Sequence, residues 1–289
     1  MLDTCLGEVG RFARQQFPAV GLMRAESFVV AAAGRGAKVY DVSRPGSPAV
    51  SSYEGHSLPV TSAEVGTESR WIFTASEDKT LKIWDFRCTG YQVSLGCTAP
   101  VLAATMHGNG AEIFYGDLDG KVNVWDLTAN RMKPLFQTRA AVTALAVDRT
   151  SLGGEPLVVG LSDGAVLSAG GGGEQEKASV ATSDASLKPF YPSTLSNELL
   201  ELGTRHSDVV TRCRVYKAGS EDVRILSCSL AGTIADGDRK ISFSPNGCGA
   251  FDAVFLSSGE LACGFSDGRL LIGTQSTTLT SGVCSLVSL

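Results

Sequence analysis

The chain of 289 residues has no apolar run that approaches the roughly 18 residues needed to cross a membrane, so we expect no membrane span. It also has no excess of basic residues, because 25 Lys and Arg stand against 30 Asp and Glu, for a formal net charge of −5. Surfaces that bind nucleic acid are usually basic, so we expect no nucleic-acid partner. The N-terminus carries Asp3 and Glu8 and lacks an apolar core of signal-peptide length, which predicts a cytoplasmic protein.

The spacing of a zinc site is also missing. Eight cysteines are present, but none forms a Cys-x-x-Cys pair and only three histidines could join them. We therefore interpret the cysteines as small thiols packed within strands, and expect no metal and no cofactor. Cys88 and Cys97 flank one predicted strand and are the one pair to test for a disulfide.

Two Gly-x-Ser-x-Gly matches, at Ser162 and Ser266, are the strongest sign of an enzyme. A nucleophile of this type needs a following helix and a histidine base within reach. No helical pattern follows either serine, no histidine follows Ser266, and only His206 follows Ser162. The glycine run at residues 170–173 lacks the Lys-Ser or Lys-Thr of a phosphate loop. We expect no catalytic residue and no small-molecule substrate.

The chain does contain an internal repeat. Residues 71–85 read WIFTASEDKTLKIWD, and residues 113–126 repeat the pattern as IFYGDLDGKVNVWD, with a period of 41 residues. A period of about 40 residues that ends in Trp-Asp is typical of the four-stranded blade of a β-propeller. Because one blade cannot cover its own faces, the rest of the chain is expected to contain more blades.

The turn between the second and third strands of the repeat occurs six times, at Gly34, Asp78, Asp119, Asp163, Ala231 and Asp267. A short alternating run precedes each turn and predicts the innermost strand of a blade. The Trp position, six residues after the turn, reads Tyr40, Trp84, Trp125, Ala169, Gly237 and Gly273, so the pattern weakens toward the C-terminus.

These features predict an all-β fold, a WD-repeat β-propeller with six recognisable blades, formed by residues 1–289 as a single domain. Residues 1–18 are expected to be irregular, and residues 170–205 to form a Gly- and Ser-rich loop between blades. Residues 283–287 are predicted as an orphan strand of an incomplete seventh blade. Two interpretations remain open: a seven-bladed protein that is short at its N-terminus, which we prefer, and a divergent six-bladed ring.

In the first clear blade, His56, Thr74, Asp78 and Trp84 match the hydrogen-bonded tetrad of WD-repeat proteins. The resemblance implies that His56 bonds to Asp78 and Thr74, and that Thr74 bonds to the Trp84 indole. We interpret this set as structural because it would satisfy polar groups buried in the blade.

A narrower resemblance runs from about residue 28 to residue 164. The motifs that support it are AAAG at residues 31–34, VYDV at 39–42, SYEG at 52–55, RWIFT at 70–74, IWDFR at 83–87 and AEI at 111–113. In order and spacing these resemble GβL, the "lethal with SEC thirteen" family of target-of-rapamycin (TOR) kinase complexes. The resemblance implies a non-catalytic subunit of both TOR complexes that docks on the kinase domain and stabilises its active-site side. Such a subunit would act in growth and nutrient signalling, in the cytoplasm and with its complex at endomembrane surfaces.

Propellers bind partners through the loops of their faces. The loops before the first strands and between the second and third strands share one face, namely residues 55–59, 76–79, 98–100, 116–119 and 137–140. Within them we expect Glu77, Lys79, Asp117 and Arg139 to contact the TOR kinase catalytic domain and its complex subunits. The alternative is a generic WD-repeat adaptor of another complex, such as a ubiquitin ligase or a vesicle coat, because fold does not fix function.

Overall fold

The computed structural model describes residues 20–22, 28–41, 49–66, 70–88, 90–147, 156–169, 199–202, 205–217, 223–237, 239–242, 247–256, 259–273 and 275–278. Within these residues every regular element is a β-strand, and the strands form six antiparallel sheets of four. The fold is therefore the all-β, WD-repeat type of propeller that the repeat predicts.

Each sheet is built from four strands that are consecutive in the chain. The first three sheets contain β1 (Val20–Leu22), β2 (Phe28–Ala33), β3 (Gly36–Asp41) and β4 (Ser51–Glu54), then β5 (Val60–Val65), β6 (Trp71–Ser76), β7 (Thr80–Asp85) and β8 (Tyr91–Gly96), then β9 (Val101–Met106), β10 (Glu112–Asp117), β11 (Lys121–Asp126) and β12 (Arg131–Gln137). The last three contain β13 (Val142–Ala146), β14 (Leu157–Leu161), β15 (Val166–Ala169) and β16 (Leu199–Glu201), then β17 (Val210–Lys217), β18 (Val223–Ser229), β19 (Thr233–Asp236) and β20 (Arg239–Ser242), then β21 (Ala250–Phe255), β22 (Leu261–Phe265), β23 (Arg269–Ile272) and β24 (Gln275–Thr278).

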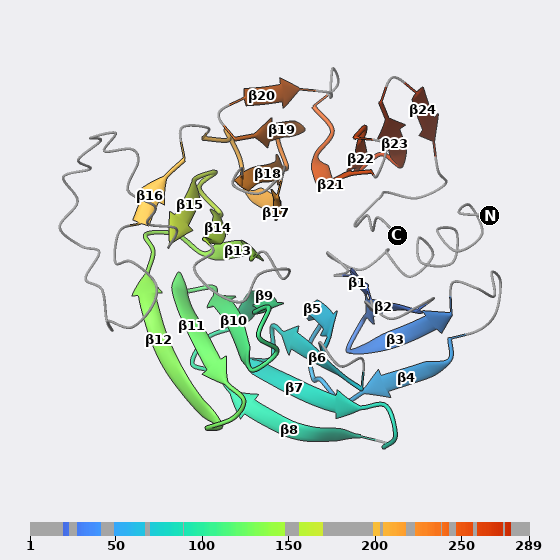
Figure 1. Ribbon diagram of the computed structural model, residues 1–289, viewed down its shortest axis with the longest axis vertical. Coiled ribbons are helices and arrows are strands. Elements are labelled where there is room, and N and C mark those ends of the chain that lie inside the picture. The colour runs from blue at the N-terminus through green and yellow to red at the C-terminus, as the bar shows by residue number, and fades with distance from the viewer. Residues whose placement is uncertain are drawn as a thin grey trace.

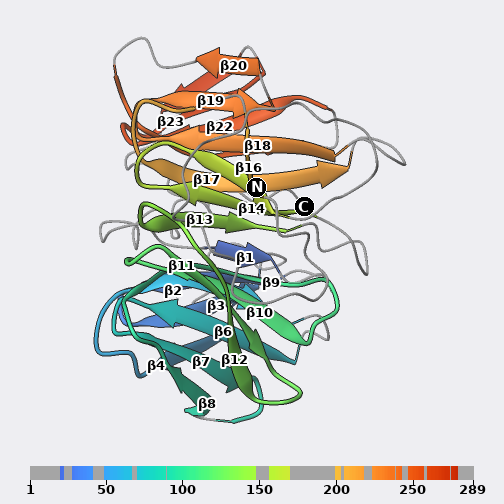
Figure 2. The same cartoon turned by 90° about the vertical axis from the view of Figure 1, so that its left-hand side faces the viewer.

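The sheets follow one another around a common centre, with the first strand of each sheet innermost and the fourth strand outermost (Figure 1). Seen from the side, most strands run between the two flat faces of the molecule, so their connections gather on those faces (Figure 2). The six predicted turns at Gly34, Asp78, Asp119, Asp163, Ala231 and Asp267 each join the second and third strands of a sheet, which confirms the sequence frame.

Apolar clusters fill the spaces between successive sheets. One cluster joins the first and second sheets around Ile72 and Trp84, and the next joins the second and third around Phe73 and Trp125. Three further clusters connect the third sheet to the fourth, the fourth to the fifth and the fifth to the sixth. Among the described residues, no apolar cluster joins the sixth sheet back to the first. The sheets therefore pack against one another in chain order.

A β-bulge recurs at the start of the innermost strand. The register shifts there in five sheets, leaving one extra residue in the first strand. In three sheets this residue is a threonine whose hydroxyl donates to a carbonyl of the next sheet: Thr61 to Val101 O at 2.9 Å, Thr143 to Val210 O at 2.7 Å and Thr211 to Ala250 O at 2.7 Å. The bulge thus ties adjacent sheets together near the centre.

The loop predicted over residues 170–205 requires a correction. Leu199–Glu201 form β16, which pairs with β15 and completes the fourth sheet, so the connection to the fifth sheet begins after Glu201 and not after Ala169. Without β16 the apolar strand β15 would form the outer edge of its sheet, and pairing removes that edge. The remaining predictions for residues 1–18, 170–198 and 283–287 lie outside the described residues.

Candidate functional site

The candidate site is the face that carries the loops before the first strands and the turns between the second and third strands, called the loop face below. In five sheets an amide at the turn donates to the carbonyl of the residue just before the first strand. The five bonds are Glu77 N to Pro59 O at 3.2 Å, Leu118 N to Pro100 O at 2.9 Å, Ser162 N to Ala141 O at 2.9 Å, Leu230 N to Val209 O at 3.0 Å and Ser266 N to Gly249 O at 2.9 Å. The same backbone bond therefore places turn and loop side by side around the face.

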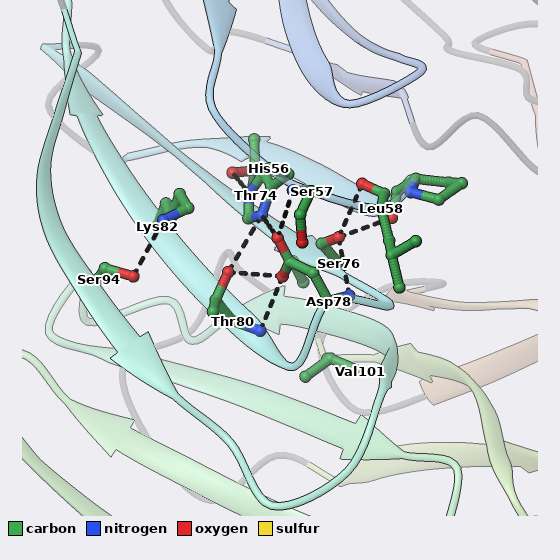
Figure 3. A network of polar contacts seen from close by, with 12 residues as sticks. His56, Ser57, Leu58, Thr74, Ser76, Asp78, Thr80, Lys82, Ser94 and Val101 are labelled. Atoms are coloured by element: carbon green, nitrogen blue, oxygen red, sulfur yellow. Dashed lines mark hydrogen bonds and ion pairs between the residues drawn. The ribbon is translucent and has the colours of Figure 1, made fainter.

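A polar network in the second sheet holds its part of the loop face (Figure 3). His56 lies in the loop before β5, Thr74 on β6 and Asp78 in the β6–β7 turn. The His56 ring contacts Asp78 Oδ2 at 2.9 Å through Nδ1 and Thr74 Oγ1 at 2.6 Å through Nε2. The indole of Trp84, on β7, donates to the same Thr74 oxygen at 2.8 Å. The structure thus brings together all four residues that the sequence groups.

The donor and acceptor roles along this network follow from its two end groups, the Asp78 carboxylate and the Trp84 indole. The pKa of His56 is lowered by burial, which outweighs the opposing effect of Asp78, so the ring is neutral near pH 7. Because a carboxylate accepts only, Nδ1 carries the proton and donates to Asp78, while Nε2 accepts from the Thr74 hydroxyl. Thr74 in turn accepts from the Trp84 indole, so every buried donor in the chain of bonds finds an acceptor.

Asp78 also orders the backbone around it. Its carboxylate accepts from Ser57 N at 2.9 Å, Thr80 N at 3.0 Å and the Thr80 hydroxyl at 2.6 Å. Burial raises the pKa of Asp78, but the bonds from Thr80, Ser57 and His56 together outweigh it and leave this pKa below its usual value. Sequence reasoning missed Thr80 and the Ser57 amide. One carboxylate therefore fixes both the loop before β5 and the β6–β7 turn.

The fifth sheet contains a reduced form of this network. His206, before β17, contacts Ser227 Oγ at 2.8 Å through Nε2 and Thr233 Oγ1 at 2.6 Å through Nδ1. Thr233 occupies the position of Thr80, and Ala231 stands where the second sheet has Asp78. The pKa of His206 is lowered to about 4, first by burial and then by Lys240. In the sequence, this network could have been found from Thr233, which lies two residues after the turn position Ala231, as Thr80 does after Asp78.

In the third sheet the equivalent positions are filled by Cys97 and Tyr115, whose side chains hydrogen-bond to each other. Burial raises the pKa of the Cys97 thiol to about 11, so it stays protonated. The Trp125 indole donates instead to Asn130 Oδ1 at 3.2 Å, in the adjoining β11–β12 turn. This sheet therefore keeps the tryptophan but not the relay to the loop face.

The four expected partner contacts differ in exposure. Lys79 is exposed and adopts a left-handed backbone conformation (φ 65°), and Glu77 is half-buried. Arg139 is partly exposed, and its Nε donates to Asp163 Oδ2 at 2.7 Å. Asp117 is a correction, because it is 1% exposed and its carboxylate accepts from Lys121 N at 2.8 Å within its own turn. Burial raises the pKa of Asp117. This carboxylate therefore stabilises the turn and is not available as a surface contact.

Two exposed leucines on the same face were missed by the sequence reasoning. Leu58, in the loop before β5, is 45% exposed, and Leu118, in the β10–β11 turn, is 52% exposed. Both leucines are held by backbone hydrogen bonds. The Leu58 carbonyl accepts from Ser76 Oγ, and the Leu118 amide donates to Pro100 O. The loop face therefore presents apolar side chains on an ordered backbone, next to the charge of Lys79.

In the part of the chain that the structure describes, neither Gly-x-Ser-x-Gly serine is bonded to a histidine. Ser162 and Ser266 lie in the β14–β15 and β22–β23 turns, and the His206 ring bonds to Ser227 and Thr233. Cys88 and Cys97 are both free thiols at opposite ends of β8. Among the described residues no group of histidine, cysteine or acidic side chains could hold a metal ion. In the same residues no helix is long and apolar enough to span a membrane.

Comparisons with known proteins agree with the repeat. The family described as "WD domain, G-beta repeat" matches residues 47–85, which cover β4 to β7. The chain is 29% identical over 125 residues to "Target of rapamycin complex subunit LST8" of Mus musculus, 31% identical over 105 residues to "Target of rapamycin complex subunit wat1" of Schizosaccharomyces pombe, and 36% identical over 86 residues to "Protein LST8 homolog" of Dictyostelium discoideum. These relatives support the resemblance to the LST8 family and describe a divergent, LST8-like chain.

The matched stretches are partial. They cover 42%, 36% and 30% of this chain and 38%, 33% and 28% of the three relatives, respectively. The chain therefore spans about a third of the length of the curated relatives it matches.

Proposed function

We propose that this protein is a non-catalytic WD-repeat scaffold subunit of TOR kinase complexes, which binds and stabilises the kinase domain in growth and nutrient signalling. The observation that carries the proposal is the similarity to several proteins named as TOR complex subunits. In this role the protein acts in the cytoplasm and reaches endomembrane surfaces with its complex.

We assign the contact to the loop face between the second and third sheets. Leu58, Leu118 and Lys79 expose two apolar side chains and one cation on loops that are tied by backbone bonds and by Asp78. Ordered loops lose little conformational entropy on binding, and exposed apolar side chains supply buried area. Glu77 and Arg139 border this surface and complete the proposed contact set, without Asp117.

The test is affinity purification of the tagged chain from its own cells, with mass spectrometry of what co-purifies. The proposal expects a TOR kinase in the purified material. It further expects that Leu118→Glu combined with Lys79→Glu lowers kinase recovery at least about tenfold, because a carboxylate would be buried in an apolar contact. The control is Arg131→Glu, which reverses an exposed charge at the start of β12, on the face opposite to the loop face. It should leave recovery unchanged.

A generic adaptor is the alternative function. It would recover a ubiquitin ligase or a coat complex and no TOR kinase. Kinase recovery that is unchanged in the double variant but lost in Arg131→Glu would keep the subunit assignment and move the contact to the opposite face.

A further inference from the structure

The outermost strand of each sheet exposes one row of backbone groups, and most of these edges carry protecting residues. β12 contains Arg131, Lys133 and Pro134, and β20 contains Arg239 and Lys240. β4 and β16 are short and end in a glutamate, and β24 has four residues. Charges, proline and short length are the usual means of keeping an edge from pairing with another chain. Among the described edges, β8 alone combines six residues with neither a charge nor a proline.

The edge of β8 is open and apolar on one side. The strand lies at the end of its sheet and pairs only with β7. Val93 and Leu95 are half-buried and pack at the rim of the core cluster between the second and third sheets. An added strand with apolar residues beside them would continue that cluster outward.

The other side of β8 carries a buried cation. Lys82, on β7, is 6% exposed, and its side chain reaches across to β8. Its ammonium donates to Ser94 Oγ at 3.1 Å and lies 3.8 Å from the centre of the Tyr91 ring (Figure 3 shows the Lys82–Ser94 bond). No carboxylate of the described residues lies within ion-pair distance of this ammonium. A nearly buried charge with one hydroxyl acceptor favours a carboxylate beside it.

These features share one geometry. Lys82 and Ser94 are directly opposite in the β7–β8 register, so they lie on the same face of the sheet. Val93 and Leu95 alternate with Ser94 and point to the other face. A strand paired to β8 would place one residue beside Ser94 on the lysine face and its two neighbours beside Val93 and Leu95 on the apolar face.

We propose that the outer edge of β8 binds an extended segment of a partner protein, which adds a fifth strand and presents a glutamate or aspartate beside Ser94 with an apolar residue on either side. Backbone bonds to β8 supply the pairing, and the carboxylate and its neighbours supply the specificity. The inference does not rest on TOR complex membership, because it uses only the edge, the cation and the alternation of β8.

The probe is a fluorescein-labelled peptide of sequence Thr-Val-Thr-Val-Glu-Val-Thr-Val-Thr, titrated with the full chain and followed by fluorescence polarisation. We expect saturable binding, and a loss of about tenfold in affinity when Gln replaces the peptide Glu. A peptide that is N-methylated at alternate residues keeps its side chains but cannot pair along one edge, and it should not bind. Lys82→Met keeps the aliphatic stem and should reproduce the Gln effect, whereas Lys133→Met, on the edge strand β12, should bind the Glu peptide as the wild type does.

Ser94→Glu gives a second variant at an exposed position, so folding is not at issue. It supplies a carboxylate next to Lys82 from within the chain and should weaken binding of the Glu peptide while leaving the Gln peptide unaffected. The proposal is overturned if no saturable binding occurs up to ~1 mM, or if Lys82→Met and the N-methylated peptide bind as well as the originals. A wild-type dimer in sedimentation that Ser94→Glu disrupts would assign the edge to a second copy and would also overturn it.

Discussion

The second and fifth sheets place a histidine at the same position, and they satisfy it in different ways. His56 donates to a carboxylate and accepts from a threonine that is itself held by the Trp84 indole. His206 contacts two hydroxyls, those of Ser227 and Thr233. In both sheets the histidine ring links the loop before the first strand to the second strand. The histidine is therefore common to the two networks, whereas Asp78 and Trp84 occur only in the second sheet.

Asp78 and Trp84 extend the network in two directions. Asp78 carries it to the loop face, where it orders the Ser57 amide and the Thr80 backbone. Trp84 carries it to the outer half of the sheet, where its ring packs against Tyr53 and Tyr91. The fifth sheet has Ala231 and Gly237 at these two positions, so its histidine orders a smaller region. We therefore expect the second sheet to be the more stable of the two.

The largest effect is expected from Trp84. Trp84→Ala should lower the free energy of unfolding by about 3 to 5 kcal/mol, because a fully buried ring is removed and a cavity remains. Trp125→Ala, at an equally buried ring in the third sheet, is the matched control for cavity size. The pair Trp84→Phe and Trp125→Phe isolates the indole bonds, and Trp84→Phe should be the more costly by about 1 kcal/mol in urea denaturation. Equal losses would mean that the Trp84 bond to Thr74 adds no more than the Trp125 bond to Asn130.

As the pH falls, the fifth sheet should lose stability first. Because the pKa of His206 falls from its ordinary value of 6.5 to about 4 on folding, the unfolded chain binds more protons between these values. Stability contributed by the neutral ring is complete above pH 6.5 and declines by up to about 3 kcal/mol as the pH falls to 4. The pKa of His56 is lowered in the same sense, whereas the lowered pKa of Asp78 acts only at more acidic pH.

The measurement is the urea midpoint between pH 7 and pH 4 for the wild type and His206→Gln. The amide of Gln still bonds to hydroxyls but does not titrate, so the variant should show a flatter profile. His107→Gln, at a partly buried ring near Glu112, is the control for the loss of an imidazole elsewhere in the protein. A His206→Gln profile as steep as that of the wild type would exclude His206 as the titrating group.

Asp78→Ala should destabilise the protein by about 1 to 3 kcal/mol, because it leaves the His56 ring and the Ser57 amide without their acceptor. Asp163 fills the same turn position in the fourth sheet but pairs with the partly exposed Arg139 and Arg205. Asp163→Ala should therefore cost less than about 1 kcal/mol. Thermal melts of both variants, at equal protein concentration, make the comparison. A smaller loss in Asp78→Ala than in Asp163→Ala would refute the network.

The smallest effect is expected between sheets. Thr211→Val removes the hydroxyl that donates to Ala250 O and keeps the side-chain shape, so it should cost about 1 kcal/mol. Thr61→Val in the second sheet removes the equivalent bond to Val101 O and should cost a similar amount. If both variants match the wild type in urea denaturation, the bulge threonines do not tie the sheets together.

The sequence was sufficient to predict the repeat, because turn residues and alternation are local properties. All six turns lie where the repeat frame places them, and the four residues of the tetrad could be grouped by their resemblance to WD-repeat proteins. Contacts between sheets were not predictable in this way, since the Thr143–Val210 bond joins residues 67 positions apart and depends on a bulge. β16 was assigned to a loop because three residues after a long insertion give too short a pattern.

Single side chains were the hardest to place. Asp117 belongs by sequence to the turn at residues 116–119, yet it ends β10 and is buried there, next to the exposed Leu118. Leu58 and Leu118 have the sequence character of ordinary apolar residues, and only the folded structure shows that their side chains are exposed. Lys82 has the spacing of a solvent-facing strand residue, and the Tyr91 ring covers it. Burial of this kind depends on which strands become neighbours, which the repeat alone does not specify.

The most direct test of the account is native-state hydrogen–deuterium exchange of the wild type and Asp78→Ala, followed by mass spectrometry of peptides from each sheet. We predict slower exchange in residues 55–60 and 76–80 than in the equivalent residues 205–210 and 229–233 of the fifth sheet. We further predict that Asp78→Ala removes this difference and leaves the fifth sheet unchanged. Equal exchange of the two regions in the wild type, or protection of residues 55–60 that survives Asp78→Ala, would contradict the claim that the aspartate network orders the loop face.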